Sequence, residues 1–378
     1  MSSRIRVLTV GMTEPFNRAL GSHPEVELHI TADPQATEHA ARSLAGIVRG
    51  VVPYRLARHK IDLSAAATLR WAVREYRPDV LQIYLARDLA AALLATTCLR
   101  NPPQLASFRG IQRRVSLFDP GDSLTFGHPR VGIHLCASHA VRQAMLESGL
   151  AASRCHTVYD TYRTTPTLGR AALSAWNIPP NALVVGCIAN MRRVKGVDLL
   201  LRAVLECNDL EICLVLIGQI LDREVQTLVE DPRLRDRVRL LGFQGEAASL
   251  ISGADLFVMP SRSEGLCVAL LEAMSHGVCP IVSEAGGMKE VVRDGQDGIV
   301  VPREDVAALA KAIRTLCLDA DLRRYYAQSA AKRVAGEFSG RRLAERVVDS
   351  YRAAMAAARP ERNHLWRTTL GRHLWRRG

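Results

Sequence analysis

The 378-residue sequence lacks any apolar run of transmembrane length and any cysteine pattern typical of a metal site. Its nine cysteines are scattered from Cys98 to Cys317, with no Cys-x-x-Cys pair and no histidine pair at zinc spacing. These absences argue against a membrane-spanning segment, a disulfide framework and a structural metal. We expect most of the cysteines to be reduced core residues.

Aromatic residues make up only 5% of the chain, although its net charge is +12 and its pI is about 9.6. A basic chain without an aromatic platform or a recognisable motif does not predict nucleic-acid binding. The first residues lead directly into the strand-like run Ile5–Val10 and lack the apolar core and cleavage site of a signal peptide. We therefore expect a cytoplasmic protein.

Hydrophobic residues account for 48% of the chain and charged residues for 23%, which is typical of a folded globular protein. A chain of 378 residues exceeds the size of one ordinary hydrophobic core, so its length indicates two domains.

The most informative segment is Ser261–Gly277, which places Glu264 and Glu272 eight positions apart across the start of an apolar helix predicted over Leu266–Ser275. Backbone N–H groups at the helix start, at Gly265 and the residue after it, would attract a diphosphate. At 1.5 Å per residue the two carboxylates would lie about 12 Å apart along the axis, so one could contact a sugar and the other a ribose. Alternatively, one is a first-turn acid favoured by the helix dipole and the other a solvated helix residue.

A second strand and a glycine turn follow this helix. Residues 279–282 read as a short apolar strand, and Gly286-Gly287 is a turn where the backbone can approach a phosphate closely. Taken in order, this half of the chain resembles the signature of the family-four retaining glycosyltransferases, enzymes of the GT-B fold that move a sugar from a nucleotide-sugar to an acceptor. The resemblance rests on the Glu-x7-Glu pair with Gly286, Gly287, Glu290, Gly295, Gly298 and Pro302. Cys267 departs from it, because the family often has proline there.

The resemblance extends back to a basic turn over residues 190–196, between a predicted strand at 184–189 and a predicted helix at 197–205. A lysine beside a glycine at a helix start, here Lys195, is well placed to neutralise a diphosphate. The family usually has an arginine five positions before that lysine, where this chain has Asn190. Either Arg192 or Arg193 could supply the missing charge. The alternative is that these cations are simply solvated in a surface turn.

Two further predicted strands end in turns at Gly218 and at Phe243. The resemblance implies that such turns hold the base of the nucleotide.

The N-terminal half of the sequence has a less regular pattern of predicted strands and helices. Predicted strands at Ile5–Val10, Val80–Tyr84, Gln104–Phe108 and Val131–Ala137 alternate with helical patterns, which is the rhythm of a doubly wound parallel sheet with ligands at the carboxyl ends of its strands. Ser138 is expected to cap the helix that follows the last of these strands.

Arg109 stands at the end of one predicted strand, where many family members have a histidine. The sequence does not decide between a role in the reaction or with the acceptor and a structural role. The segment 111–129, with Asp119, Asp122 and His128, has no clear periodicity, so it is either an acceptor loop or an ordinary long connection.

The sequence thus predicts an α/β protein of the GT-B class, two Rossmann-like doubly wound domains facing a central cleft. The expected units are 1–167 on the acceptor side, 168–345 for the nucleotide-sugar, and a closing helix and basic tail over 346–378 that could cross back to the first domain. The resemblance implies transfer with retention and without a metal. Glu264 would hold the sugar and Glu272 the ribose, while Lys195, one of the neighbouring arginines and the helix start stabilise the leaving diphosphate.

The expected partners are a nucleotide-sugar donor and an acceptor that we take to be a glycolipid or polysaccharide precursor; no other cofactor is expected. Two alternatives remain open. A nucleotide-sugar epimerase of the same fold would convert the donor without an acceptor, and a non-catalytic GT-B scaffold, suggested by Asn190 and Arg109, would bind nucleotide without turnover. Asp319 and Asp321 match a metal-binding Asp-x-Asp, but a plain helical run follows them, so first-turn acids are the better interpretation.

The last twenty residues, 359–378, contain six arginines and one glutamate. Tryptophans and leucines are interleaved with these charges near helical spacing, a composition typical of a helix on an anionic membrane. We therefore predict peripheral binding to the inner face of the cell membrane, lost on deletion of residues 363–378. The alternative is a closing helix with solvated arginines.

Overall fold

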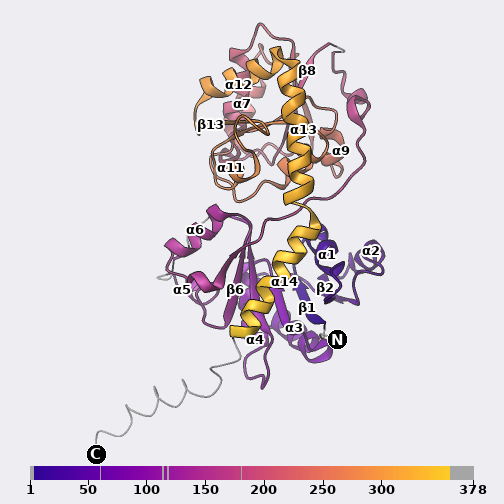
Figure 1. Cartoon of the computed structure of the whole chain (residues 1–378), viewed down its shortest axis with the longest axis vertical. Helices are drawn as coiled ribbons and strands as arrows, with labels where there is room; N and C mark the ends of the chain where they lie inside the picture. Colours follow the sequence, from indigo (N-terminus) through magenta and orange to yellow (C-terminus); the bar gives the residue numbers. More distant parts are fainter. Residues whose placement is uncertain (1–3, 60, 113–114, 117–118, 180, 358–378) are drawn as a thin grey trace, which may run out of the picture.

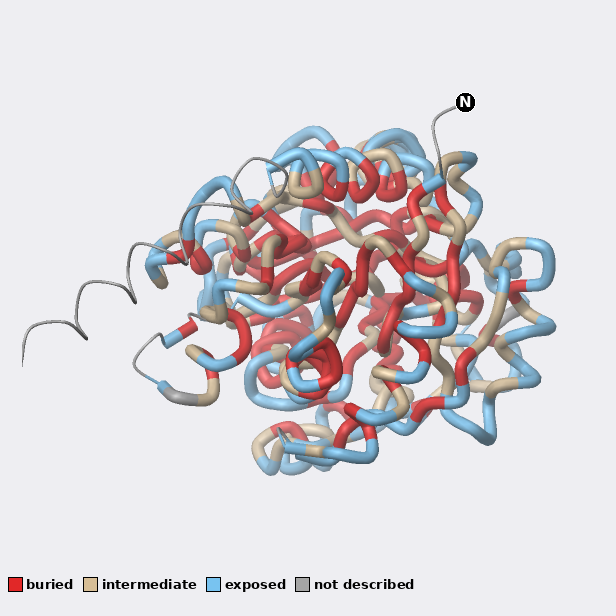
Figure 2. Tube along the Cα trace, turned by 90° about the horizontal axis from the view of Figure 1, so that it is seen from below, coloured by how far each residue is buried: buried red, intermediate tan, exposed pale blue. Residues whose placement is uncertain are grey.

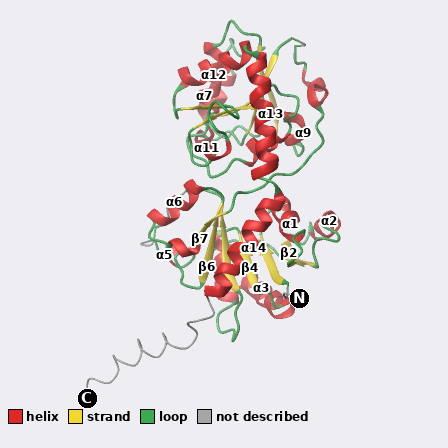
Figure 3. Ribbon diagram, viewed as in Figure 1, coloured by secondary structure: helices red, strands yellow, loops and turns green. Residues whose placement is uncertain are grey.

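The computed structural model describes residues 4–59, 61–112, 115–116, 119–179 and 181–357. Two bodies, each built on a parallel sheet, lie one above the other and are joined by extended segments and by the helices at the end of the chain (Figures 1 and 3). Within the described residues, no helix combines the length and the apolarity needed to cross a membrane. The basic tail predicted at 359–378 lies outside the described residues.

The first sheet has seven strands in the order β3-β2-β1-β4-β5-β6-β7, all paired in parallel. Its strands are β1 (Ile5–Val10), β2 (Val26–Ala32), β3 (Gly50–Pro53), β4 (Val80–Ile83), β5 (Gln104–Arg109), β6 (Val131–Cys136) and β7 (Cys155–Thr157). The connecting helices are α1 (Glu14–Gly21), α2 (Thr37–Ser43), α3 (Leu63–Tyr76), α4 (Ala86–Ala95), α5 (Pro120–Ser123) and α6 (His139–Glu147). Ser138 caps α6 as predicted, since its hydroxyl accepts from the Val141 N–H at 3.1 Å.

The second sheet has six parallel strands in the order β10-β9-β8-β11-β12-β13. They are β8 (Leu183–Ile188), β9 (Ile212–Ile217), β10 (Val238–Gly242), β11 (Leu256–Met259), β12 (Cys279–Ser283) and β13 (Ile299–Val301). Its helices are α7 (Val197–Glu206), α8 (Arg223–Val229), α9 (Ala247–Ile251), α10 (Val268–Ser275), α11 (Met288–Val291), α12 (Val306–Leu318) and α13 (Ala320–Glu337). Both sheets reverse their strand order in the middle, at β1/β4 and β8/β11, which are the switch points where open α/β sheets bind ligands.

Alternate residues of the first sheet enter two different cores, because successive side chains of a strand point to opposite faces. Val7 packs with α1 and with α14 (Gly340–Ala357), while Leu8 and Val10 pack with α3 and α4. The chain therefore returns from the second body through α13, and α14 covers one face of the first sheet (Figure 1). Figure 2 shows this layering from below, with buried strands between partly exposed helices.

The return of α14 is fixed by specific contacts. The buried Tyr351 hydroxyl donates to Oε1 of Gln82 on β4 at 2.9 Å, and the Thr161 hydroxyl donates to the Phe338 carbonyl at 2.9 Å. The prediction of two doubly wound domains in a GT-B arrangement is confirmed. The exact domain boundaries after residues 167 and 345 stay predictions.

Candidate active site

Lys195 and Glu264, two predicted site residues separated by 69 positions, form one ion pair. The Lys195 Nζ atom lies 2.9 Å from Oε1 and 2.8 Å from Oε2 of Glu264, and the side chains are only 27% and 11% exposed. Burial lowers the pKa of Lys195, but the nearby Glu264 carboxylate outweighs this and leaves the pKa raised. The pair thus places a partly buried cation and a carboxylate together at the carboxyl edge of the second sheet.

The backbone around Glu264 differs from the prediction. Helix α10 begins at Val268, two residues later than predicted, and buried Cys267 is its N-cap. Glu264 therefore lies in the loop before the helix and not in its first turn, so the separation of two carboxylates along one helix axis does not apply. Gly265 and Leu266 likewise precede the helix.

Arg262 fixes this loop, and the sequence analysis did not single it out. Its guanidinium makes a two-pronged ion pair with buried Asp198 of α7, with Nη1–Oδ1 at 2.6 Å and Nη2–Oδ2 at 2.7 Å. Its Nε atom lies 2.6 Å from a carboxylate oxygen of Glu304, and Nη1 also donates to the Arg193 carbonyl. The hydrogen bond to Asp198 raises the pKa of Arg262. Arg262 therefore ties the loop of Glu264 to the turn that carries Lys195.

The two arginines of the basic turn, Arg192 and Arg193, differ in their contacts. Arg193 reaches Glu224 on α8 at 3.2 Å, and Arg202 also contacts that carboxylate. Arg192 is exposed and makes no ion pair with a carboxylate in the described part of the chain. Asn190 is exposed as well. Of the two arginines, Arg192 is thus the one not committed to a neighbouring helix.

Gly218 and Phe243 lie where β9 and β10 end, at the same edge of the sheet as the basic turn. Gly218 adopts φ +132°, and a Cβ there would approach the Ala189 carbonyl oxygen to 2.0 Å. Its N–H donates to the Gly242 carbonyl at 2.8 Å, which joins the two turns. The Phe243 side chain is 73% exposed, so an aromatic face stands open next to them.

Glu272 lies on α10, between the buried residues Leu271 and Ala273. Burial raises the pKa of its carboxyl to about 7, and the charge of Arg163 opposes this rise. An ionised Glu272 is therefore costly in the unliganded protein.

This cost predicts a pH dependence of stability. Because the folded-state pKa lies above the ordinary 4.5, the folded protein binds the proton more tightly, and stability is lost as pH rises from about 4.5 through about 7. We expect Glu272→Gln to remove this loss, which is on the order of 1–2 kcal/mol for a partly exposed group. Chemical denaturation at about pH 5 and about pH 8 measures it. Parallel pH profiles of the two proteins would contradict the assignment.

Arg109 ends β5, and its guanidinium carbon lies 3.9 Å from the centroid of the buried Phe126 ring. This stacking joins the strand end to the segment 111–129. The contact supports a structural role, and a part in the reaction stays a prediction.

The polar side chains Asp119, Asp122 and His128 of the segment 111–129 accept hydrogen bonds from backbone groups close in sequence. An Asp119 carboxylate oxygen accepts from the Asp122 N–H at 2.9 Å, Asp122 accepts from the Ser116 N–H, and His128 accepts from the Arg130 N–H. These bonds stabilise turns and favour the interpretation of an ordinary connection. Asp319 is likewise a helix cap, because it accepts from the Leu322 N–H at the start of α13.

The two bodies touch through their loops at the carboxyl ends of β5, β6, β11 and β12. Glu290 reaches across and accepts from the His139 and Ala140 N–H groups at 2.7 and 2.8 Å, so it completes the N-terminus of α6. Glycines make the close approach possible. A Cβ on Gly265 would lie 1.9 Å from the Gly110 carbonyl oxygen, and one on Gly287 would lie 2.8 Å from the Ser138 side chain.

Beside these contacts is a cavity of about 750 Å³ between the two bodies. Its walls include His139, Arg142 and Gln112 from the first body and Ser263, Lys289 and Arg303 from the second. The cavity begins next to Glu264, because Ser263 precedes it and a Cβ on Gly286 would lie 1.7 Å from the Glu264 carbonyl oxygen.

Comparison with known proteins agrees with this geometry. Residues 171–333, somewhat less than half of the chain, match the family model described as glycosyl transferases group 1. The lipopolysaccharide core biosynthesis mannosyltransferase LpcC of Rhizobium leguminosarum bv. viciae is 26% identical over 71% of this chain and 76% of its own length. A D-inositol 3-phosphate glycosyltransferase of Corynebacterium urealyticum is 29% identical over 57% of this chain, but the match spans only 52% of that protein.

Solved structures of other proteins share this two-domain fold over most of the chain. A glycosyltransferase from Rickettsia africae superimposes with a TM-score of 0.77 at 15% identity, over 93% of this chain and 99% of that one. HepE from Anabaena, in complex with UDP and glucose, gives 0.74 at 17% identity, over 93% and 100%. The chain is a GT-B glycosyltransferase. These matches favour neither the epimerase nor the non-catalytic scaffold.

A single substitution, Gly265→Ala, tests whether this glycosyltransferase needs the close contact between the loops of its two domains. Gly265→Ala would place a Cβ 1.9 Å from a carbonyl oxygen of the other domain, so the loops must separate. We expect the variant to fold normally and to bind nucleotide, but to lose about tenfold or more of its transfer rate, because misplacing groups in a cleft by about 1 Å is costly.

Gly336→Ala is the matched control, because it lies in α13 with open space around it. Small-angle scattering of both variants measures whether the domains separate. An unchanged transfer rate in Gly265→Ala would show that the contact is not needed for the reaction.

Proposed function

We propose that this glycosyltransferase moves a glycosyl group from a nucleotide-sugar to a glycan or lipid-linked acceptor, with retention of the anomeric configuration and without a metal ion. The observation that carries the proposal is the partly buried Lys195–Glu264 pair at the carboxyl edge of the second sheet. It sets a cation, which would stabilise the charge of a departing nucleoside diphosphate, next to the carboxylate that we propose binds the sugar.

In this mechanism Lys195 and Arg192 bind the diphosphate and stabilise the negative charge that develops on it as the glycosidic bond breaks. When Lys195 binds the diphosphate, its ion pair with Glu264 is broken. Glu264 can then accept hydrogen bonds from the sugar hydroxyls. Glu272 would accept from the ribose, and Gly218 with Phe243 would border the base. Arg262 touches none of these groups and acts as a positioning residue through the two loops.

The acceptor side is proposed from the relatives. One relative is described as a lipopolysaccharide core mannosyltransferase, and another acts on an inositol phosphate by its name. An acceptor attached to a lipid would require this enzyme to work at a membrane surface. We therefore propose a cytoplasmic enzyme at the inner face of the cell membrane.

A panel of nucleotide-sugars tested for protection against thermal unfolding identifies the donor. A donor at about a hundred times its dissociation constant stabilises the native state by about 2.7 kcal/mol, which is readily measured. The protecting donor is then incubated with and without acceptor glycolipids, and the anomeric configuration of the product is determined by NMR. Donor conversion without any acceptor would favour an epimerase, protection without turnover would favour a scaffold, and an inverted product would refute retention.

A further inference from the structure

The outer surface of α3 and α4 exposes large apolar side chains, among them Trp71, whose ring also meets the Tyr76 ring edge-on with 5.9 Å between the centroids. Leu63, Ala67, Trp71 and Arg74 recur at helical spacing on α3 and are all exposed, while Ala65, Leu69 and Ala72 on the other side are buried. The Trp71 side chain is 52% exposed and Leu63 is 72% exposed. Half-exposed tryptophan is typical of sites where an apolar and an aqueous phase meet.

The two helices present this surface as one unit. Arg70 of α3 donates to the Ala95 and Thr97 carbonyls at the end of α4, at 3.2 and 3.0 Å. Leu94 of α4 is 42% exposed, and Ile61, just before α3, is 73% exposed. We call the surface formed by Ile61, Leu63, Trp71, Leu94 and the arginines described next the α3–α4 face.

Positive charge dominates the part of the chain that forms this face, with Arg55, Arg58 and Arg87 at the carboxyl ends of the strands and Arg74, Arg77 and Arg100 at their amino ends. Six arginines between residues 54 and 100 are exposed, against one exposed acid, Glu75, and none of the six pairs with a carboxylate within the described residues. The other acids nearby are occupied: Asp62 caps α3, Asp79 pairs with Arg6, and Asp88 accepts from the Tyr54 hydroxyl. The exposed arginines are Arg55, Arg58, Arg74, Arg77, Arg87 and Arg100.

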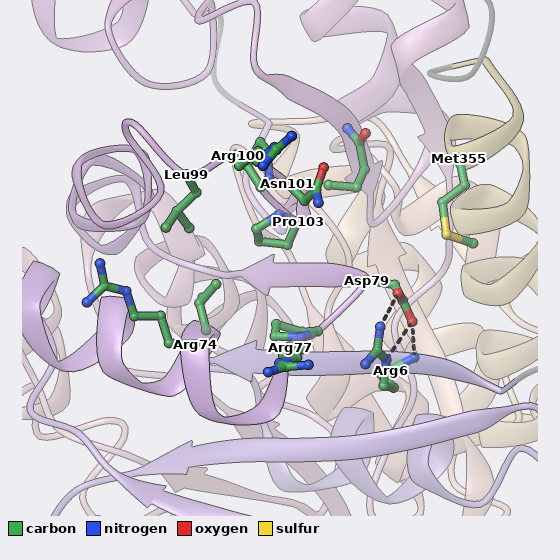
Figure 4. Close-up of a pocket in the computed structure, with 13 residues that line it drawn as sticks. Arg6, Arg74, Arg77, Asp79, Leu99, Arg100, Asn101, Pro103 and Met355 are labelled. Atoms are coloured by element: carbon green, nitrogen blue, oxygen red, sulfur yellow. Dashed lines mark hydrogen bonds and ion pairs between the residues drawn. The ribbon is translucent and has the colours of Figure 1, made fainter. Parts of the chain in front are cut away.

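At one end of the face lies a cavity of about 860 Å³, at the amino ends of the strands (Figure 4). Arg74, Arg77 and Arg100 stand around it, Arg6 is held beside it by Asp79, and Met355 of α14 borders it on the side away from Arg74. The helix α14 therefore ends beside this cavity, and the sequence continues from there into residues 359–378 with six arginines and one glutamate.

We propose that the α3–α4 face docks this enzyme onto an anionic phospholipid bilayer. Trp71, Leu63, Ile61 and Leu94 enter the boundary between headgroups and acyl chains, while the arginines contact lipid phosphates. The face lies on the side of the first sheet opposite α14, whereas the cavity between the domains lies beyond the carboxyl ends of the strands. The inference rests on the proposed lipid-linked acceptor for its purpose, but binding to the bilayer does not depend on turnover.

The test is flotation of the full chain with vesicles of phosphatidylcholine alone and with added phosphatidylglycerol. We expect binding to the anionic vesicles at low salt, and release as salt screens the charges. Arg74→Glu, Arg87→Glu and Arg100→Glu together should weaken binding at least about tenfold, because each surface cation contributes to the attraction. The matched control is Arg223→Glu, Arg235→Glu and Lys332→Glu, three exposed cations of the second domain with the same change in charge. It should bind nearly as the wild type.

A second variant, Trp71→Ser with Leu94→Ser, tests the apolar part and should also weaken binding without altering charge. Circular dichroism and protection by the donor that the panel identifies establish that each variant is folded and keeps its nucleotide site, so a failure of the proposed function would appear there and not in flotation. Deletion of residues 363–378 separates the tail from the face: the tail composition alone predicts that binding is lost, whereas docking through the α3–α4 face predicts that binding persists. The proposal is overturned if the wild type does not bind anionic vesicles, if the face variants bind like the control, or if the deletion alone abolishes binding.

Discussion

Lys195→Ala is expected to lower the rate of sugar transfer by about a hundredfold or more, the loss that follows removal of one preorganised electrostatic contact. The substitution removes the cation proposed to bind the departing diphosphate and leaves Glu264, only 11% exposed, without its partner. Glu264→Gln should cause a loss of the same order, since the amide keeps the shape but not the charge. Initial rates with the identified donor measure both.

Lys332→Ala is the control, because this lysine is exposed on α13 in the same domain. Circular dichroism checks the fold of each variant, and the two active-site substitutions should not be additive because the residues form one pair. Near-normal turnover by folded Lys195→Ala would remove the basis of the diphosphate site.

The second sheet could be predicted in detail from the sequence because its strands are short apolar runs and its turns carry glycines. The predicted strand at 279–282 is β12, and the predicted helix at 197–205 is α7 to within one residue. Parallel strands buried on both faces are nearly continuous in Val, Ile and Leu, so they are readily recognised. The acidic and basic residues at their carboxyl ends were found from the pattern at the predicted helix starts and from the family resemblance.

In the first half, β2, β3 and β7 were not predicted. Strand β2, Val26–Ala32, mixes glutamate, histidine and threonine with its apolar residues, and β3 and β7 are short edge strands. Their place in the sheet is decided by neighbours far away in sequence, and edge strands carry the weakest local signal.

The start of α10 was placed too early for a similar reason. Gly265 and Leu266 have neighbours that favour a helix, yet the Gly265 carbonyl accepts from the Gly287 N–H at 3.1 Å and its Cα faces Gly110. These contacts come from another loop and from the other domain. Local patterns contain no information about either partner.

Arg262 is the clearest case of a functional residue that the sequence conceals. Its partner Asp198 is 64 positions away, in the first turn of α7, where an acid is expected for reasons of the helix dipole alone. An arginine in a polar loop and an acid at a helix start are each common. Only the fold brings them to 2.6 Å and shows that both loops of the site depend on them.

Arg262→Ala is expected to destabilise the protein by about 3 kcal/mol, because it leaves the Asp198 side chain, 4% exposed, as an unpaired buried charge. It should also abolish most of the protection that the donor gives against unfolding, since Lys195 and Glu264 lose their common support. Arg262→Lys should recover only part of both, because an ammonium cannot make the two-pronged contact. Urea denaturation with and without donor measures the two effects.

The double variant with Asp198→Asn separates support of the site from stability. Replacing the buried carboxylate by a neutral amide removes the unpaired charge, so the double variant should regain about 1–2 kcal/mol relative to Arg262→Ala. Donor protection should stay low, because the loops of Lys195 and Glu264 remain untied. If donor protection returned together with stability, Arg262 would act on the site only through the overall fold; if neither returned, the pair with Asp198 would not be the interaction that Arg262 supplies.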